Sequence, residues 1–300
     1  MTVGSRLRTP RFVWTIPLLL LPLIAVPRPS EAADPFGTQG RPPRTVLQGG
    51  VFAVTLRPVA WLEDLQGSLD EQPLTFFRVG SGQVQTLVGI DLEASGRRRL
   101  RLTGKDRQGR LRVREWRIRI TPRRLAVQRL TLPQEMVELD AEASRRVTEE
   151  ASRLNELWRR MTPERYWHGA FLPPVASAGL PEGFGFRRMI NEQPRSPHSG
   201  ADYHAPPGSV VRASNAARVA LAEEQFFGGN SLVLDHGLGL YTVYFHLERL
   251  LVKAGDRVHK GQEIGRVGAT GRATGPHLHF GVRLQGARVD PAALLRLSLP

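Results

Sequence analysis

Residues 277–284 are His277-Leu278-His279-Phe280-Gly281-Val282-Arg283-Leu284, in which polar and apolar side chains alternate. This alternation predicts a half-buried β-strand. Side chains two positions apart lie on the same face of a strand, with their Cα atoms about 7 Å apart. His277 and His279 therefore share a face, on which one ring can bind a metal ion while the other stands beside the metal-bound water.

Two upstream segments carry further candidate ligands. Residues 240–247 also alternate as a strand does, and the pattern places His246 on one face with Thr242 and Tyr244. His198 and Asp202 have the i, i+4 spacing of a helix, but prolines flank them and a glycine lies between them. These helix-breaking residues favour a loop or the start of a strand there.

The candidate groups suit a catalytic zinc site. Catalytic zinc usually takes three protein ligands from His, Asp and Glu and keeps a fourth position for water, whose pKa falls to about 7. A lone histidine is more often a turn or core residue. The combination of His-x-x-x-Asp, an isolated His and His-x-His within one region favours the metal site instead. The candidates are His198, Asp202, His246, His277 and His279.

This region resembles the lysostaphin-type, LytM-like zinc metallopeptidases, which cleave peptide bonds in the peptidoglycan of bacterial cell walls. Many short motifs follow one another in the order of that family. They are Phe184-Gly185-Phe186-Arg187-Arg188, Pro197-His198-Ser199-Gly200-Ala201-Asp202-Tyr203, Gly229-Asn230, Asp235-His236-Gly237, Tyr244-Phe245-His246-Leu247, Gly255-Asp256-Arg257-Val258, Gly261-Gln262-Glu263-Ile264-Gly265, Gly268-Ala269-Thr270-Gly271, Thr274-Gly275-Pro276-His277-Leu278-His279-Phe280 and Val289-Asp290-Pro291.

Position by position, the resemblance implies that His198, Asp202 and His279 bind Zn²⁺. It also implies that His246 and His277 flank the water and the scissile carbonyl and act in catalysis.

The other histidines have separate interpretations. At His204 the family usually has a small or aliphatic residue. We expect this histidine to face solvent or to contact a metal ligand without binding the metal itself, and a competing metal ligand is the alternative. We expect His236 to belong to a hairpin turn, and His168 and His259 to be surface or packing residues.

The expected mechanism is peptide hydrolysis by metal-activated water. A zinc ion with one carboxylate ligand stays net positive, polarises the carbonyl and generates hydroxide near neutral pH. The sequence contains no HExxH motif, so a glutamate base on a zinc-binding helix is not available. A histidine must therefore act as the base and return the proton to the leaving amine, and both His246 and His277 qualify.

The amino terminus predicts export. Arg6, Arg8 and Arg11 precede an apolar run over residues 12–26, which contains two prolines. The run is shorter than the roughly 20 residues of a membrane-spanning helix. We predict a signal peptide over residues 1–32 with cleavage after Ala32, an uncleaved anchor being the alternative. The chain would then meet the membrane only transiently and act in the periplasm or cell envelope of a Gram-negative organism.

Composition agrees with an exported enzyme. The formal net charge is +14, which suits an anionic cell wall, and an exported chain rarely meets DNA, so we expect no nucleic-acid partner. The chain has 0 cysteines. Disulfides, thiol catalysis and a cysteine-rich zinc site are therefore excluded.

The predicted fold class is mainly β, in five segments. After the signal peptide, residues 33–45 form a flexible linker and residues 46–125 a β-sandwich-like domain with antiparallel strands near 51–56, 74–79, 86–91 and 111–120. Residues 126–170 form a helical linker with a helix over 140–161, whose apolar stripe is Val147, Ala151, Leu154 and Trp158. Residues 171–300 form the antiparallel LytM-like metallopeptidase domain.

These inferences favour a secreted zinc endopeptidase that acts on the peptide stems of peptidoglycan. The preferred bond is a D-alanyl to diaminopimelate cross-link, and a glycine bridge stays open. One alternative is a non-catalytic wall-binding protein or activator of another hydrolase. Another is a biotinyl- or lipoyl-type carrier hairpin at residues 252–262, which lacks the lysine tip that such carriers need. The amino-terminal domain would bind the wall or a regulatory partner, or cover the groove and keep the enzyme latent.

Overall fold

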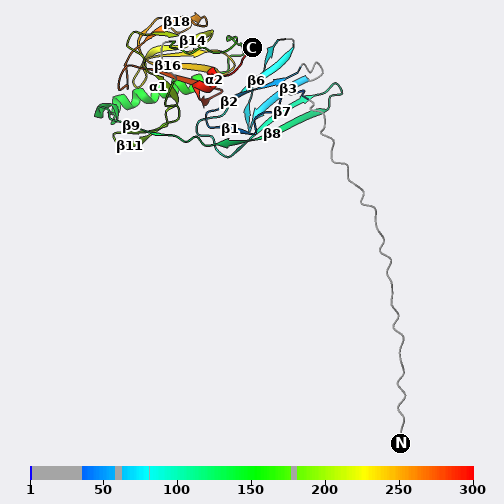
Figure 1. Ribbon diagram of the computed structural model, residues 1–300. Coiled ribbons are helices and arrows are strands. Elements are labelled where there is room, and N and C mark those ends of the chain that lie inside the picture. The colour runs from blue at the N-terminus through cyan, green and yellow to red at the C-terminus, as the bar shows by residue number, and fades with distance from the viewer. Residues whose placement is uncertain (2–35, 58–62, 81, 177–180) are drawn as a thin grey trace. The chain divides into compact units, whose positions relative to one another are not determined.

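A computed structural model of the chain describes residue 1 and residues 36–57, 63–80, 82–176 and 181–300 (Figure 1). The predicted signal peptide beyond residue 1 and the start of the predicted linker lie outside these ranges. Strands dominate the described part, which confirms the mainly β class. Among the described residues, no helix is both long enough and apolar enough to span a bilayer.

The first eight strands form two sheets, in the orders β1-β8-β7-β3-β4 and β2-β6-β5. Their bounds are β1 (Thr45–Leu47), β2 (Val51–Leu56), β3 (Glu63–Leu69), β4 (Gln72–Pro73), β5 (Phe77–Val79), β6 (Gln83–Gly89), β7 (Arg97–Lys105) and β8 (Leu111–Thr121). Both sheets contribute side chains to one buried cluster, among them Val54, Val88, Leu100 and Ile118. The predicted sandwich is confirmed, except that β1 and β8 are parallel.

Some predicted strand positions agree with the structure better than others. β2 coincides with the predicted run, and β8 ends one residue later than predicted. The run at 74–79 is a strand only from Phe77, and β6 starts and ends earlier than the run at 86–91. β7 was not predicted, because arginines fill most of its outward positions and only Leu100 and Leu102 mark the apolar face.

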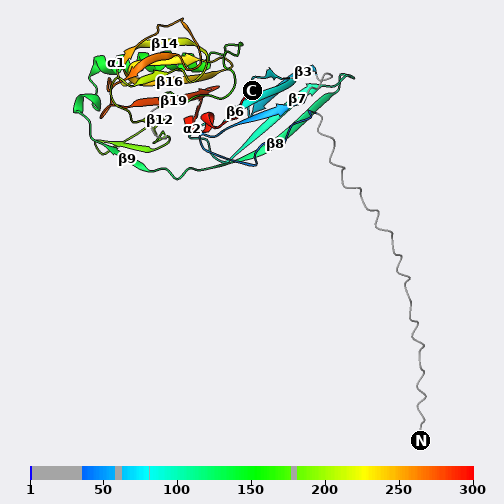
Figure 2. The same cartoon turned by 45° about the horizontal axis from the view of Figure 1, so that its top comes forward.

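The carboxyl-terminal region contains a nine-stranded sheet with the path β12-β19-β16-β15-β14-β17 (Figure 2). Off this path, β13 pairs with β18, β18 with β16, and β20 with β19. The bounds are β12 (Gly200–Tyr203), β13 (Val210–Arg212), β14 (Ala217–Gln225), β15 (Gly229–Asp235), β16 (Leu240–Leu250), β17 (Arg257–Val258), β18 (Glu263–Val267), β19 (Leu278–Leu284) and β20 (Ala287–Val289). Every residue of β19 except Arg283 is buried, so the half-buried prediction was wrong. Phe280 and Val282 enter the main core, while another buried cluster covers the face that carries Val243 of neighbouring β16.

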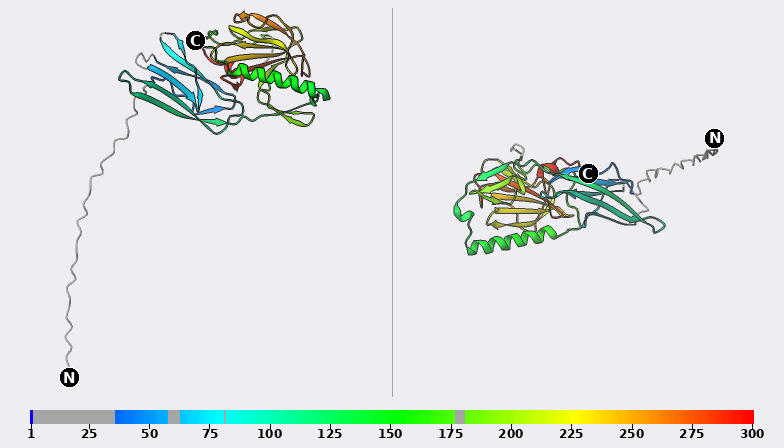
Figure 3. Two further views of the ribbon diagram at one scale, coloured as in Figure 1. Left: turned by 180° about the vertical axis from the view of Figure 1, so that it is seen from behind. Right: turned by 90° about the horizontal axis from the view of Figure 1, so that it is seen from below.

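Helix α1 (Ala141–Arg159) lies where a helix was predicted and packs along the sheet (Figure 3). The Asp140 side chain caps its first turn by accepting a hydrogen bond from the Ala143 N–H. Its buried residues are Glu150 and Leu157, whereas Ala151 of the predicted stripe is exposed. Leu154 and Trp158 of the predicted stripe do pack against the sheet, so the prediction is partly confirmed, and the packing face extends to Leu157 and to the carboxylate of Glu150.

A third small sheet joins the two regions, in the order β11-β10-β9. Its strands are β9 (Val127–Leu130), β10 (Arg187–Ile190) and β11 (Gln193–Arg195), and the remaining helices are η1 (Gln134–Met136) and α2 (Pro291–Leu295). The predicted helical linker thus begins with a strand, which pairs in parallel with β10. Phe77 of the sandwich also contacts Trp167 edge to face, with ring centroids 5.1 Å apart.

Candidate metal centre

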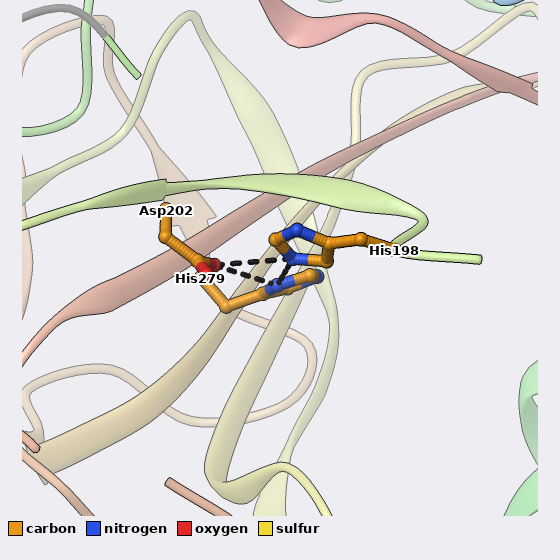
Figure 4. Close-up of side chains that lie close together, drawn as sticks. All are labelled: His198, Asp202 and His279. Carbon is orange, nitrogen blue, oxygen red and sulfur yellow. Dashed lines mark hydrogen bonds and ion pairs between the residues drawn. The ribbon is translucent and has the colours of Figure 1, made fainter. Parts of the chain in front are cut away.

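Strand pairing brings three donor side chains together. β12 and β19 are antiparallel neighbours in which Asp202 is directly opposite His279, and His198 lies just before β12. The His198 Nε2 atom is 2.8 Å from His279 Nδ1 and 3.1 Å from Asp202 Oδ1. His279 Nδ1 is 3.2 Å from the same oxygen. One atom of each residue thus points at a common centre (Figure 4).

The geometry fits a tetrahedral metal ion. Ligand atoms about 2.0 Å from zinc lie about 3.3 Å from one another, close to the three separations observed. The His198 ring is oriented by Nδ1, which donates to the Gly183 carbonyl at 3.0 Å. Its Nε2 atom therefore carries the lone pair that a metal needs, and the carbonyl plays the outer role usual for metal-bound histidines.

The protonation states also suit a cation. Burial lowers the pKa of His198 to about 4 and lowers that of His279, so both rings are neutral at pH 7. Burial alone would raise the pKa of Asp202, but hydrogen bonds with His198 and His279 hold it well below its usual range. Two neutral imidazoles and one carboxylate are a donor set typical of catalytic zinc.

Gly200 lets the two strands approach at the site. A Cβ atom there would lie 2.6 Å from His279 Nε2 and 2.6 Å from the Phe280 carbonyl oxygen. Any side chain at this position would displace the His279 ring from the cluster of three donors. The glycine between His198 and Asp202 is therefore needed for packing as well as for chain direction.

His246 and His277 lie beside the three donors with equivalent hydrogen bonding. Each Nδ1 donates to a backbone carbonyl at 2.8 Å, His246 to Thr270 and His277 to Gly275. The two rings are 4.7 Å apart, and His277 Nε2 is 3.8 Å from Asp202 Oδ1. Both Nε2 atoms are thereby left as proton acceptors.

His246 does not lie on the face predicted for it. Thr242 and Tyr244 point into the core, where their hydroxyls are hydrogen-bonded to each other. His279 is opposite Phe245, on the other face of the sheet. His246 reaches the His279 side because its backbone is left-handed, with φ of 65°, and breaks the alternation. Burial, followed by the charges of His279 and His277, lowers its pKa to about 3.

A narrow groove of about 40 Å³ runs beside these rings. One wall is made by Asp202, His246, His277 and the loop at 272–274, and the other by Gln128, Leu130 and Leu132 with Arg188 and Ile190. The second wall belongs to β9, β10 and the residues after β9. Because protein side chains form both walls of this narrow groove, a peptide cannot enter it unless the second wall moves.

Sequence reasoning missed three arginines near the site. Arg188 and Arg272 line the groove, and together with Arg195 they line an adjoining cavity of about 390 Å³. Burial, followed by the charges of Arg188 and Arg195, lowers the pKa of Arg272 to about 10. Burial also lowers the pKa of Arg188, and the negative charge of Asp202 partly offsets this shift. The paired arginines of the motif at 184–188 were the only available signal.

The remaining histidines lie outside the cluster. His204 is exposed, and its ring is 6.2 Å from that of His277. His168 and His259 are exposed, as expected. His236 lies in the hairpin connection between β15 and β16, as predicted, and is fully buried: its Nδ1 donates to the Ala216 carbonyl and its Nε2 accepts from the Thr242 hydroxyl.

Residues 196–291 match the model of Peptidase family M23. Over 94 residues the chain is 43% identical to the peptidoglycan DD-endopeptidase ShyB of Vibrio cholerae, a match covering 31% of this chain and 22% of that protein. Over 126 residues it is 35% identical to the DD-carboxypeptidase/endopeptidase Mpg of Neisseria meningitidis, covering 42% of this chain and 29% of that protein. The matches thus span less than a third of either relative.

The similarity in fold extends further. A crystal structure of a peptidase M23 from Pseudomonas aeruginosa matches with a TM-score of 0.64 at 27% identity, covering 83% of this chain and 94% of that one. Since this coverage exceeds residues 196–291, strands outside the family match share the arrangement.

Proposed function

We propose that this chain, whose residues 196–291 match the model of Peptidase family M23, is a zinc-dependent endopeptidase that hydrolyses peptide cross-links of bacterial peptidoglycan. One observation carries the proposal. A cluster of two neutral imidazoles and one carboxylate lies beside two further histidines whose Nε2 atoms are free to accept protons. The metal ligands would be His198, Asp202 and His279.

The other residues provide the proton chemistry. A zinc ion held by the cluster would lower the pKa of a bound water to about 7 and polarise the scissile carbonyl. His246 and His277 are held by Thr270 and Gly275 in the tautomer that leaves Nε2 unprotonated. One of them takes the proton from the water and returns it to the leaving amine.

The proposed place of action is the periplasm or cell envelope of a Gram-negative organism. The relatives ShyB and Mpg come from Gram-negative bacteria, and their names describe peptidases of DD bonds. We favour a D-alanyl to diaminopimelate cross-link over a glycine bridge for the same reason. The amino-terminal sandwich is proposed to contact the wall or a regulatory partner.

Single substitutions separate metal binding from catalysis. His198→Ala and Asp202→Ala should lose bound zinc and activity together, since each removes a ligand. His246→Ala and His277→Ala should keep most of the zinc and lose about 10²–10⁴-fold in turnover, because they remove only proton transfer. Metal content by elemental analysis and fragment release from purified sacculi are the measurements.

His259→Ala is the control, because His259 is exposed and follows β17, at the opposite end of the sheet path from β12. If His246→Ala or His277→Ala digested sacculi at the normal rate, the catalytic role proposed for that histidine would be wrong. A zinc-loaded protein that binds sacculi but releases no fragments would favour the non-catalytic wall-binding alternative.

A further inference from the structure

Arg188 and Arg272 connect the groove at the metal centre with the adjoining cavity. Both line the groove with Asp202, His246 and His277. Both also line the cavity of about 390 Å³, to which Arg195 contributes a third guanidinium. A ligand with its reacting bond at the histidines could thus place a neighbouring group among three positive charges.

None of these three guanidiniums has a carboxylate within salt-bridge distance in the described part of the chain. Arg188 donates to the Gln128 side chain at 3.3 Å, and Arg195 donates to the Val137 carbonyl at 3.2 Å and to Gln193. The Arg195 Nε atom is buried without any hydrogen-bond partner. Arg272 lies 3.8 Å above the ring of Phe227.

Among the other partly buried arginines of the described residues, some have a carboxylate partner, whereas Arg283 and Arg165 have none. Arg288 forms a forked pair with Asp91, and Arg123 donates to Asp290 at 2.6 Å. Partial burial of a guanidinium without a counter-ion is costly, and three that repel one another are more so. An anionic ligand would offset this cost, and the planar fork of arginine matches a carboxylate in particular.

We infer that the Arg188, Arg195 and Arg272 cavity binds the free carboxylate of the substrate residue that contributes the leaving amine. The inference rests on the proposed function and names its substrate class. In a D-alanyl to diaminopimelate cross-link, the carbon that carries the scissile nitrogen also carries a free carboxylate, within about 4 Å of that nitrogen. A carboxylate so placed reaches Arg188 and Arg272 while the carbonyl lies at the histidines. The residues of a glycine bridge have no free carboxylate at that carbon.

The test uses two soluble peptides that differ only in this group, one with the free carboxylate and one with the carboxamide. The zinc-loaded full chain should cleave the acid about tenfold or more faster in kcat/KM. In Arg188→Met and Arg272→Met the ratio of acid to amide should fall close to one. Arg187→Met is the matched control, because Arg187 is the exposed neighbour of Arg188 on β10, and it should keep the wild-type ratio.

The ratio separates recognition from general damage, because a misfolded variant loses both substrates alike. Calorimetric titration of the same peptides into zinc-loaded wild type and variants provides a second readout. Absence of any cleavage would overturn the proposed function, while preferential binding of the acid, lost in the two variants, would still support the subsite. Equal binding and equal cleavage of acid and amide by the wild type would overturn the proposed subsite, while the proposed endopeptidase function would be unaffected.

Discussion

The backbone of His246 lies in the left-handed region, with φ of 65°. A non-glycine residue there costs of order 1–3 kcal/mol unless its surroundings hold it. Two backbone carbonyls do so: Gly228 accepts from the His246 N–H at 2.7 Å, and Thr270 accepts from Nδ1 at 2.8 Å. The strain is therefore located where the ring must leave the regular strand to reach the candidate metal centre.

His236 offers a test of buried histidine energetics away from the metal centre. Burial lowers its pKa to about 4, below the value of about 6.5 expected in the unfolded chain. Its contribution to stability is thus fully present above about pH 6.5 and is lost as the pH falls towards 4, by about 3 kcal/mol. We expect denaturant unfolding at pH 7.5, 5.5 and 4.5 to show a smaller pH-dependent loss for His236→Gln than for the wild type. Parallel curves for the two proteins would contradict this.

At the scale of elements, α1 is anchored by a buried carboxylate. The two oxygens of Glu150 accept from the Phe226 N–H at 3.2 and 2.9 Å, and Oε1 also accepts from Arg146 at 2.8 Å. The loop that begins at Phe226 supplies Gly228, whose carbonyl holds His246, and Phe227, over which Arg272 lies. The helix thus supports two parts of the site without touching the metal cluster.

Glu150→Ala should lower the free energy of unfolding by about 1–3 kcal/mol, because it leaves the Phe226 N–H without its partner. It should also lower turnover, since the loop holding His246 loosens. Glu149→Ala is the matched control: its carboxylate is exposed and pairs only with Arg145 on the surface, so it should cost under about 1 kcal/mol. Chemical denaturation and cleavage rates are the measurements, and equal effects of the two substitutions would rule out the anchoring role.

The elements also show which features of the fold sequence periodicity predicts and which it does not. The strands at 51–56, 111–120 and 278–284 and the helix near 140–161 were predictable, because each repeats its local pattern over several residues. The packing face of α1 was predicted only in part: Leu154 and Trp158 lie on it, but Glu150 is buried by a hydrogen bond that depends on a distant loop. β7 was missed because its outward arginines dilute the apolar alternation.

At the scale of the whole molecule, the segment that follows the sandwich forms the second wall of the groove. Leu132 in this wall is held by Asn191, which accepts from its N–H and donates to its carbonyl, both at 2.9 Å. A groove of about 40 Å³ is too small for a peptide, so we expect movement of this wall to precede binding.

Asn191→Gly tests the wall directly. Asn191 has φ of 48°, which glycine adopts without strain, so the substitution removes only the two hydrogen bonds. We expect kcat/KM for a cross-linked peptide to rise about three- to tenfold, with zinc content unchanged. Glu192→Gly is the control for backbone freedom, since Glu192 also has positive φ but is exposed, and its carboxylate pairs with Arg129 on the surface. A rate for Asn191→Gly no higher than that of the control would show that the wall does not limit access.

The sequence by itself determined the mainly β class, the similarity of residues 196–291 to a peptidase family, and the donor types that the structure brings together. Those features depend on residue identity and short spacing, which a regular backbone translates directly into a shared face. Tertiary structure alone decided the side on which His246 lies, the cavity formed by Arg188, Arg195 and Arg272, and the wall at Leu132. Each of these results from an irregular backbone or from segments far apart in the chain, whose contacts no local pattern encodes.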